Sequence, residues 1–223
     1  MSEKQDPSLT DTTRRRFVKT AGAAAAAGAA IGFPSVTFGV PNDKKLKIGV
    51  VGTGGRGGGA MLNALAADDN VELYSMGDLY LAEAEKKLAM VRKSPIAKDK
   101  LAGDLDSRVF SGIDSYKKVI DSGVDVILLT TPPGFRPTHF KAAVEAGINC
   151  FVEKPCATDI AGVKDFLATS KIAAEKGLSV LCGFCYRYSQ QGRALFERIH
   201  DGAIADIRSV HSIYHAGPVK AMP

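Results

Sequence analysis

The chain has 223 residues, of which 45% are hydrophobic, 24% charged and 7% aromatic, with 4 cysteines and a formal net charge of +5. The apolar fraction excludes an intrinsically disordered chain, and the few cysteines and aperiodic glycines exclude a disulfide scaffold and a collagen-like fibre. Residues 1–40 contribute five basic and three acidic residues, so the remainder carries an ordinary solubility charge. No basic stripe with interleaved aromatic residues occurs, and we expect no nucleic-acid partner.

Residues 1–40 have the layout of an export signal. A basic segment at 13–19, reading TRRRFVK, precedes a short Ala- and Gly-rich stretch that ends near Phe33; this order is typical of a secretory signal peptide. The basic segment resembles the twin-arginine signature. The apolar stretch is too short to cross a bilayer core of ~30 Å, which argues against a membrane anchor. We therefore expect recognition by the Tat translocase and a periplasmic or exported protein; a surface helix with chance arginines is the alternative.

From residue 44 the pattern alternates between strands and helices. Short apolar runs predict strands at 46–51, 71–77, 124–129, 148–152 and 178–182. Helical spacing of apolar residues predicts helices at 57–67, 81–91, 116–120, 140–144 and 160–174, with a polar loop at 94–107. This alternation predicts an α/β domain with a doubly wound parallel sheet over 44–187.

The remaining segment, 188–223, reads as the start of a second, α+β domain. Residues 190–201 look helical, and 204–214 alternate like a strand. One helix and one strand do not make a core. We expect either that the chain is part of a longer protein or that these last residues pack on the first domain.

The first strand leads into a glycine-rich turn. Residues 52–57, which are Gly52, Thr53, Gly54, Gly55, Arg56 and Gly57, fit G-x-G-x-x-G between a strand and a helix. The first glycine allows the tight turn, the second allows a pyrophosphate to approach the backbone, and the third allows close packing of helix on strand. The free N–H groups of the helix would bind the pyrophosphate.

Asp78 ends the second predicted strand, 21 positions after Gly57. A carboxylate at this place accepts hydrogen bonds from ribose hydroxyls and repels a 2′-phosphate. Leu79 follows, and no arginine lies close by in the sequence. The sequence therefore favours NAD over NADP.

Two further turns follow strands of the predicted sheet. Thr130-Thr131-Pro132-Pro133 comes after the strand at 124–129, with His139 on the next helix, and Glu153-Lys154-Pro155 comes after the strand at 148–152. Doubly wound sheets bind ligands at the carboxyl ends of their strands. A plain turn with a surface histidine and a solvated strand end are the structural alternatives for these two segments.

Together these segments resemble the glucose–fructose oxidoreductase/inositol dehydrogenase (Gfo/Idh/MocA) family. The resemblance rests on 52–57, Asp78, the Thr131 and Glu153 turns, and the run 183–188, which reads GFCYRY. It implies a Rossmann domain in which Lys154 lies between nicotinamide and substrate, while Glu153 fixes that lysine or contacts the nicotinamide side. It also implies a cis bond before Pro155, a place for Arg187 at the cleft between domains, and assembly of relatives through the second-domain sheet.

The resemblance implies an NAD-dependent oxidoreductase that transfers hydride between nicotinamide and a sugar, cyclitol or polyol. An NAD-dependent glycosidase of the same fold and a truncated, non-catalytic dinucleotide-binding protein are the alternatives. No further catalytic residue of the second domain is found before Pro223, and His200, His211 and His215 are read as structural.

The cysteines do not predict a metal site. Cys182 and Cys185 form a C-x-x-C pattern without a second pair to complete a zinc site. We expect no bound metal and free, mostly buried thiols.

Overall fold

The computed structural model describes residues 45–204, 206–215 and 217. The predicted signal peptide at 1–40 lies outside these residues, so its assignment stays a prediction. Within the described part of the chain, no helix is both long enough and apolar enough to span a bilayer.

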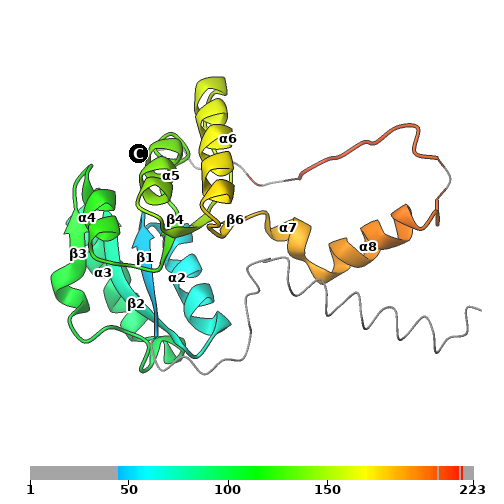
Figure 1. The fold of residues 1–223 in the computed structure, drawn as a ribbon. Coiled ribbons are helices and arrows are strands. Elements are labelled where there is room, and N and C mark those ends of the chain that lie inside the picture. The colour runs from blue at the N-terminus through cyan, green and yellow to red at the C-terminus, as the bar shows by residue number, and fades with distance from the viewer. Residues whose placement is uncertain (1–44, 205, 216, 218–223) are drawn as a thin grey trace, which may run out of the picture. The chain divides into compact units, whose positions relative to one another are not determined.

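Six parallel strands form one sheet in the order β3-β2-β1-β4-β5-β6 (Figure 1). This is the order of a Rossmann sheet, with the direction of winding reversed between β1 and β4. The predicted α/β doubly wound fold is thereby confirmed. The strands are β1 (Leu46–Val51), β2 (Val71–Asp78), β3 (Val109–Ser111), β4 (Val126–Leu129), β5 (Asn149–Val152) and β6 (Val180–Cys182).

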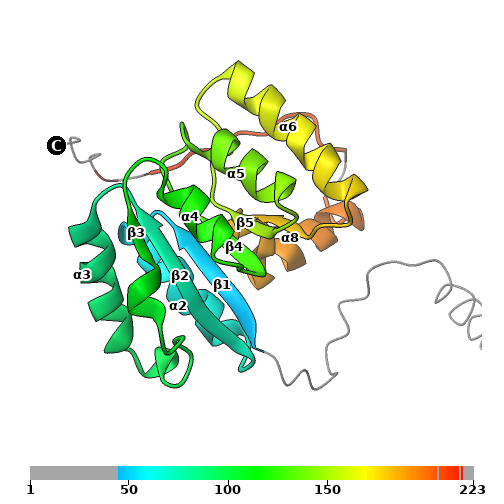
Figure 2. The ribbon, with the colours of Figure 1, turned by 60° about the vertical axis from the view of Figure 1, so that its left-hand side comes forward.

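Helices cover both faces of the sheet. Contacts link α2 with α3 on one face, and α4 with α5 and α5 with α6 on the other; Figure 2 shows the latter three side by side. Neighbouring residues of one strand therefore reach different cores: Val50 belongs to the α2 side and Val51 to the α4–α5 side. The helices are α2 (Gly55–Ala67), α3 (Leu81–Arg92), α4 (Ser115–Asp121), α5 (Arg136–Glu145) and α6 (Ile160–Glu175).

The segment between α3 and α4 is more structured than its polar sequence suggests. It contains two 3₁₀ turns, η2 (Pro95–Ala97) and η3 (Leu105–Arg108), and then strand β3. β3 was not predicted, because three residues are too few to show an alternating pattern. Its pairing with Met76–Asp78 of β2 makes the strand.

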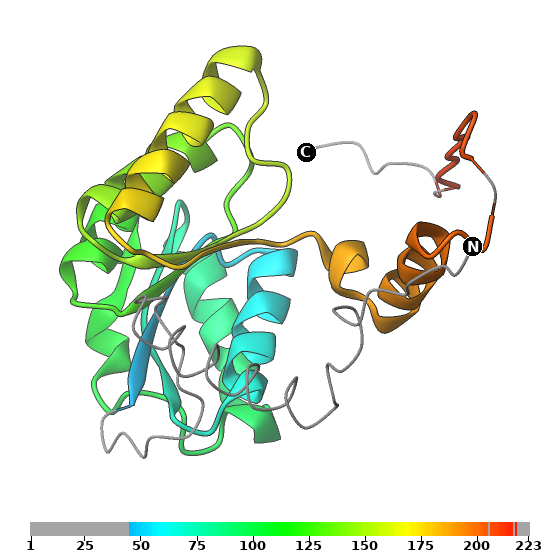
Figure 3. The same cartoon turned by 45° about the vertical axis from the view of Figure 1, so that its right-hand side comes forward.

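After β6 come two short helices, α7 (Cys185–Tyr188) and α8 (Gln190–His200), drawn in orange in Figure 3. α8 confirms the predicted helix. The strand predicted at 204–214 is wrong for the residues that are described: 206–215 form no strand, and Val210, Ile213 and Tyr214 are largely exposed. Alternation alone does not make a strand, because its N–H and C=O groups need a neighbouring strand as partner.

Candidate functional site

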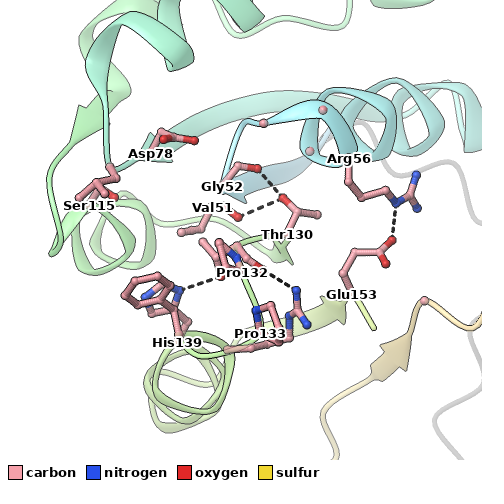
Figure 4. A pocket seen from close by; sticks show the side chains of 18 of the residues that line it. Val51, Gly52, Arg56, Asp78, Ser115, Thr130, Pro132, Pro133, His139 and Glu153 are labelled. Carbon is pink, nitrogen blue, oxygen red and sulfur yellow. Dashed lines mark hydrogen bonds and ion pairs between the residues drawn. The ribbon is translucent and has the colours of Figure 1, made fainter. Parts of the chain in front are cut away.

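A cavity of about 880 Å³ lies where β1, β2, β4 and β5 end. It is lined by the glycine turn, by Asp78, by the Thr130–Pro133 turn and by Glu153 and Lys154 (Figure 4). This is the point where the winding of the sheet reverses, and doubly wound folds bind ligands there. Four predicted features, from the glycine turn at 52–57 to Lys154, are thus brought to one cavity.

Glycine is required at two positions of the turn after β1. Gly52 has φ +89°, and a Cβ there would lie 2.6 Å from the backbone nitrogen of Thr131. At Gly57 a Cβ would overlap the carbonyl oxygen of Gly52. The hydroxyl of Thr130 holds the turn by donating to the carbonyls of Val51 (3.0 Å) and Gly52 (2.5 Å). The turn is therefore packed directly against the end of β4.

α2 begins at the cavity without a side-chain cap on Gly54. The first N–H groups of an α-helix have no partner inside the helix, and the helix dipole favours an anion beside them. Gly54 and Gly55 line the cavity, and a Cβ at either would meet no protein atom within 4 Å. The open backbone here suits the close approach of a pyrophosphate.

Asp78 is bound to the glycine turn. Its Oδ2 accepts hydrogen bonds from the backbone N–H of Thr53 (2.6 Å) and from the Thr53 hydroxyl (2.8 Å), and Oδ1 accepts from the N–H of Tyr80 (3.2 Å). Thr53 itself is fully buried and does not line the cavity. Its interaction is with Asp78, whose carboxylate it orients at the cavity wall.

Glu153 links the lysine turn to the glycine turn. Its buried carboxylate accepts from Nε of Arg56 at 2.5 Å and, through Oε2, from the backbone N–H of Lys154 at 3.1 Å. A Cβ on Gly183 would lie 3.0 Å from Oε1, so the bare glycine backbone leaves room for the carboxylate. The ionic partner of Glu153 is thus Arg56, with the side chain of Lys154 left to face the cavity.

Lys154 is exposed and lines the cavity. The peptide bond between Lys154 and Pro155 is cis, as the family resemblance implied. Lys154 thus contributes to the cavity wall directly after β5, the strand that pairs with β4.

Arg136, at the start of α5, is a site residue that the sequence analysis missed. It is buried, and its guanidinium donates to the backbone carbonyls of Thr131 and Pro155. Burial lowers the pKa of Arg136, while the charge of Glu153 opposes this; arginine nevertheless stays protonated. This one side chain joins the two turns that follow β4 and β5.

His139 lies beneath the Thr131 turn rather than on the surface. The side chain is buried, its Nδ1 lies 3.3 Å from the hydroxyl of Thr131, and its ring stacks on Tyr116 with centroids 4.2 Å apart. Burial, aided by the positive charge of Arg136, lowers the pKa of His139 to about 4. The imidazole is therefore neutral at neutral pH.

The lowered pKa of His139 predicts a loss of stability in acid. The unfolded chain binds a proton near pH 6.5 and the folded chain only near pH 4, so stability falls as the pH drops through this window. We expect His139 to account for about 3 kcal/mol of the unfolding free energy lost between pH 7 and pH 4. Urea unfolding at both pH values should show this loss in the wild type and a smaller one in His139→Gln.

The exposed His200 on α8 provides the control for this prediction. His200→Gln should leave the pH dependence of unfolding unchanged. A His139→Gln protein that loses as much stability in acid as the wild type would contradict the prediction.

Two predicted site residues do not line the cavity: Thr53, which is buried beside Asp78, and Arg187, which is exposed on α7. Among the described residues no group of three His, Cys, Asp or Glu side chains is arranged to hold a metal ion. The predicted residues that do line the cavity are Gly52, Gly54, Gly55, Arg56, Gly57, Asp78, Thr130, Thr131, Pro132, Pro133, His139, Glu153 and Lys154.

The domain is a dinucleotide-binding domain of the Rossmann class. This class is defined by the strand order, by the glycine turn after β1 and by Asp78 at the end of β2. The chain belongs to the Gfo/Idh/MocA oxidoreductase family with an NAD-binding Rossmann fold, which matches residues 46–184. The family resemblance seen in the sequence is thereby confirmed.

The similar proteins include glycosyl hydrolase family 109 proteins and inositol 2-dehydrogenases. The chain is 28% identical over 174 residues to a glycosyl hydrolase family 109 protein from Streptomyces coelicolor, covering 76% of this chain and 34% of the relative. It is 27% identical over 169 residues to inositol 2-dehydrogenase from Azotobacter vinelandii, covering 74% of this chain and 44% of that one. The chain thus spans less than half the length of these relatives.

Among solved structures, the chain resembles scyllo-inositol dehydrogenase from Lactobacillus casei with bound NAD(H) and scyllo-inositol. The TM-score is 0.58 at 22% identity, over 73% of this chain and 43% of that one. This likeness supports the fold.

Proposed function

We propose that this chain is the dinucleotide-binding part of an NAD-dependent oxidoreductase that acts on a CH–OH group of a sugar, cyclitol or polyol. The observation that carries the proposal is the single cavity that brings together the glycine turn, Asp78 and Lys154. Calorimetry with NAD and with NADP tests the cofactor, and release of NADH, followed by its absorbance, tests the reaction. If the protein bound neither NAD nor NADP, the proposal would be overturned.

Residues of this chain suit the pyrophosphate and the adenosine end of NAD. The glycine turn and the first turn of α2 would bind the pyrophosphate, and Asp78 would accept hydrogen bonds from the adenosine ribose. Leu79, Tyr80 and Ile113, which line the cavity near Asp78, carry no positive charge. A ribose 2′-phosphate would therefore meet a carboxylate without a counter-charge, and this favours NAD over NADP.

Lys154 would act at the other end of the cavity. Bound NAD supplies the hydride acceptor. The Lys154 ammonium would donate a hydrogen bond to the reacting substrate oxygen and stabilise the negative charge that develops on it. It would also orient the substrate's C–H bond. Because Glu153 is paired with Arg56, the Lys154 ammonium is available for the substrate.

A second candidate is an NAD-dependent glycosidase, in which oxidation and re-reduction of the sugar assist cleavage of a glycosidic bond. The similarity to glycosyl hydrolase family 109 proteins favours it. A dehydrogenase releases one NADH per substrate, whereas such a glycosidase releases none overall. Binding of NAD without any turnover would instead indicate a non-catalytic dinucleotide-binding protein.

Export through the twin-arginine pathway is part of the proposal. Residues 13–19 support it, and this route carries folded proteins, so a tightly held cofactor can be loaded before export. NAD stoichiometry in protein purified from the periplasm tests this. Assembly of the whole protein into homo-oligomers is likewise proposed from the family.

Changing Asp78 should change the choice of cofactor. In Asp78→Asn the repulsion of a 2′-phosphate is removed and the acceptor for the ribose hydroxyls is weakened. We expect the affinity for NAD to fall about tenfold, or about 1.4 kcal/mol, and the ratio of NAD to NADP affinity to fall by more. Calorimetry measures both, and Asp121→Asn on the exposed end of α4 is the control. An unchanged ratio would contradict the role of Asp78.

Removing the Lys154 ammonium should impair turnover but not NAD binding. Turnover is measured in the longest open reading frame that contains the chain, since the chain spans less than half the length of these relatives. In Lys154→Ala we expect kcat to fall more than tenfold, on the scale of at least 1.4 kcal/mol of transition-state stabilisation, with NAD affinity kept. Lys164→Ala on α6 serves as the control. Turnover within tenfold of the wild type would show that Lys154 has no catalytic role.

A further inference from the structure

The turn that carries Lys154 also carries Cys156, whose sulfur lies against the sulfur of another cysteine, Cys182. Cys156 follows Lys154 and Pro155, and its Sγ lies 3.8 Å from the Sγ of Cys182 at the end of β6. The two residues are 26 positions apart in sequence, and both are half-buried. The contact joins the segment after β5 to the end of β6. It is distinct from the C-x-x-C pattern of Cys182 and Cys185.

We propose that Cys156 and Cys182 are a disulfide-forming pair that links the Lys154 turn to the end of β6. The sulfurs are already in contact in the reduced chain, so forming the bond requires them to approach from 3.8 Å to the roughly 2 Å of a disulfide. Gly183, next to Cys182, packs on the carboxylate of Glu153. The bond would therefore cross-link the two segments that enclose this carboxylate.

The other cysteines do not offer such a contact. Cys150 is buried, and its thiol donates to the carbonyl of Ile148 at 3.2 Å. Burial raises its pKa to about 12, which leaves it unreactive at neutral pH. Cys185 is exposed on α7. Among the cysteines that the structure describes, only Cys156 and Cys182 have their sulfurs in contact.

A small oxidant can reach Cys182. Cys182 lines a second cavity of about 300 Å³, together with Phe151, Leu181 and Cys185. We name the oxidant by class, as a low-molecular-weight disulfide such as oxidised glutathione. One cysteine thiolate attacks a sulfur of this disulfide and releases one thiol; the other cysteine thiolate then attacks the mixed disulfide and releases the second thiol. The protein loses two protons and two electrons, and the oxidant becomes two thiols.

The reaction should accelerate as the pH rises. Burial and the neighbouring Cys156 raise the pKa of Cys182 to about 11, and the thiolate is the attacking species. The cross-linking rate should therefore rise between pH 7 and pH 9. The bacterial periplasm favours disulfides, so the proposed export would place the pair where the bond persists. The cross-link itself does not depend on export or on catalysis.

Mass spectrometry tests the proposal on the whole chain. After folded protein is treated with oxidised glutathione, two of the four cysteines should become inaccessible to N-ethylmaleimide in denaturant, and reduction should restore them. Trypsin leaves Cys150 with Cys156 and Cys182 with Cys185 in single peptides, so variants must assign the bond. Cys156→Ser and Cys182→Ser should abolish it, whereas Cys150→Ala and Cys185→Ser should keep it.

A thermal scan provides the second measurement. A bond across this loop should raise the unfolding midpoint by about 5–10 °C over the reduced protein, and the increase should be absent in Cys156→Ser. The proposal is overturned by a bond between Cys182 and Cys185, by a bond that forms only in unfolded protein, or by four thiols that stay reactive after oxidation. Because none of these measurements uses dinucleotide or substrate, their failure is distinct from failure of the proposed function.

Discussion

Replacing Gly54 by alanine should strongly weaken dinucleotide binding while leaving the fold intact. A Cβ at Gly54 would meet no protein atom within 4 Å, and the residue has a negative φ of −58°, outside the left-handed region that favours glycine. The added methyl group would, however, project at the place where the pyrophosphate must approach the backbone. We expect the NAD affinity to fall on the order of 100-fold, or about 2.7 kcal/mol, with an unchanged unfolding midpoint in urea. Calorimetry and urea unfolding measure the two quantities.

Two other glycines of the same run make this test specific. Gly59→Ala adds a methyl group at an ordinary 3.5 Å from the guanidinium of Arg56, and it should bind NAD normally and gain up to about 1 kcal/mol of helix stability. Gly57→Ala should instead destabilise the fold by about 2–3 kcal/mol, because its Cβ would overlap the Gly52 carbonyl. If Gly54→Ala bound NAD as tightly as Gly59→Ala does, the pyrophosphate would not lie against Gly54.

The main lines of the fold could be predicted because its signals are local. Five of the six strands coincide with short apolar runs. The glycines that follow helices at 123, 147 and 177 all have positive φ, from 69° to 83°. The glycine turn and the acid after β2 lie at spacings fixed by the geometry of one β-α-β unit. Sequence reasoning could therefore place them at the same end of the sheet.

The parts that could not be predicted depend on contacts distant in sequence. Arg136 lies in the polar run after Pro133 and has no spacing that distinguishes it from a surface residue; only its burial between the two turns reveals its role. The sequence predicts that Glu153 fixes Lys154 or contacts the nicotinamide side, but it gives no sign of the ion pair of Glu153 with Arg56, 97 positions away. The contact of Cys156 with Cys182 likewise depends on how β5 and β6 lie side by side.

Arg136 should be among the largest single contributors to the stability of the site. Its guanidinium donates to two carbonyls, those of Thr131 and Pro155, and the charge faces the carboxylate of Glu153. In Arg136→Met the apolar stem is kept, but the two carbonyls lose their donor and the buried carboxylate of Glu153 loses a nearby positive charge. We expect the unfolding free energy in urea to fall by about 3–5 kcal/mol.

Two further variants, Arg136→Lys and Arg92→Met, separate the possible causes of this loss of unfolding free energy. Arg136→Lys keeps the charge but lacks the planar fork that reaches two carbonyls at once, so it should restore only part of the stability. Arg92→Met removes an exposed ion pair with Asp106, which should cost at most about 1 kcal/mol. Because Arg136 ties the Thr131 turn to the Lys154 turn, the NAD affinity of Arg136→Lys should fall as well. If Arg136→Met were within 1 kcal/mol of the wild type, the two turns would have to be held by other contacts.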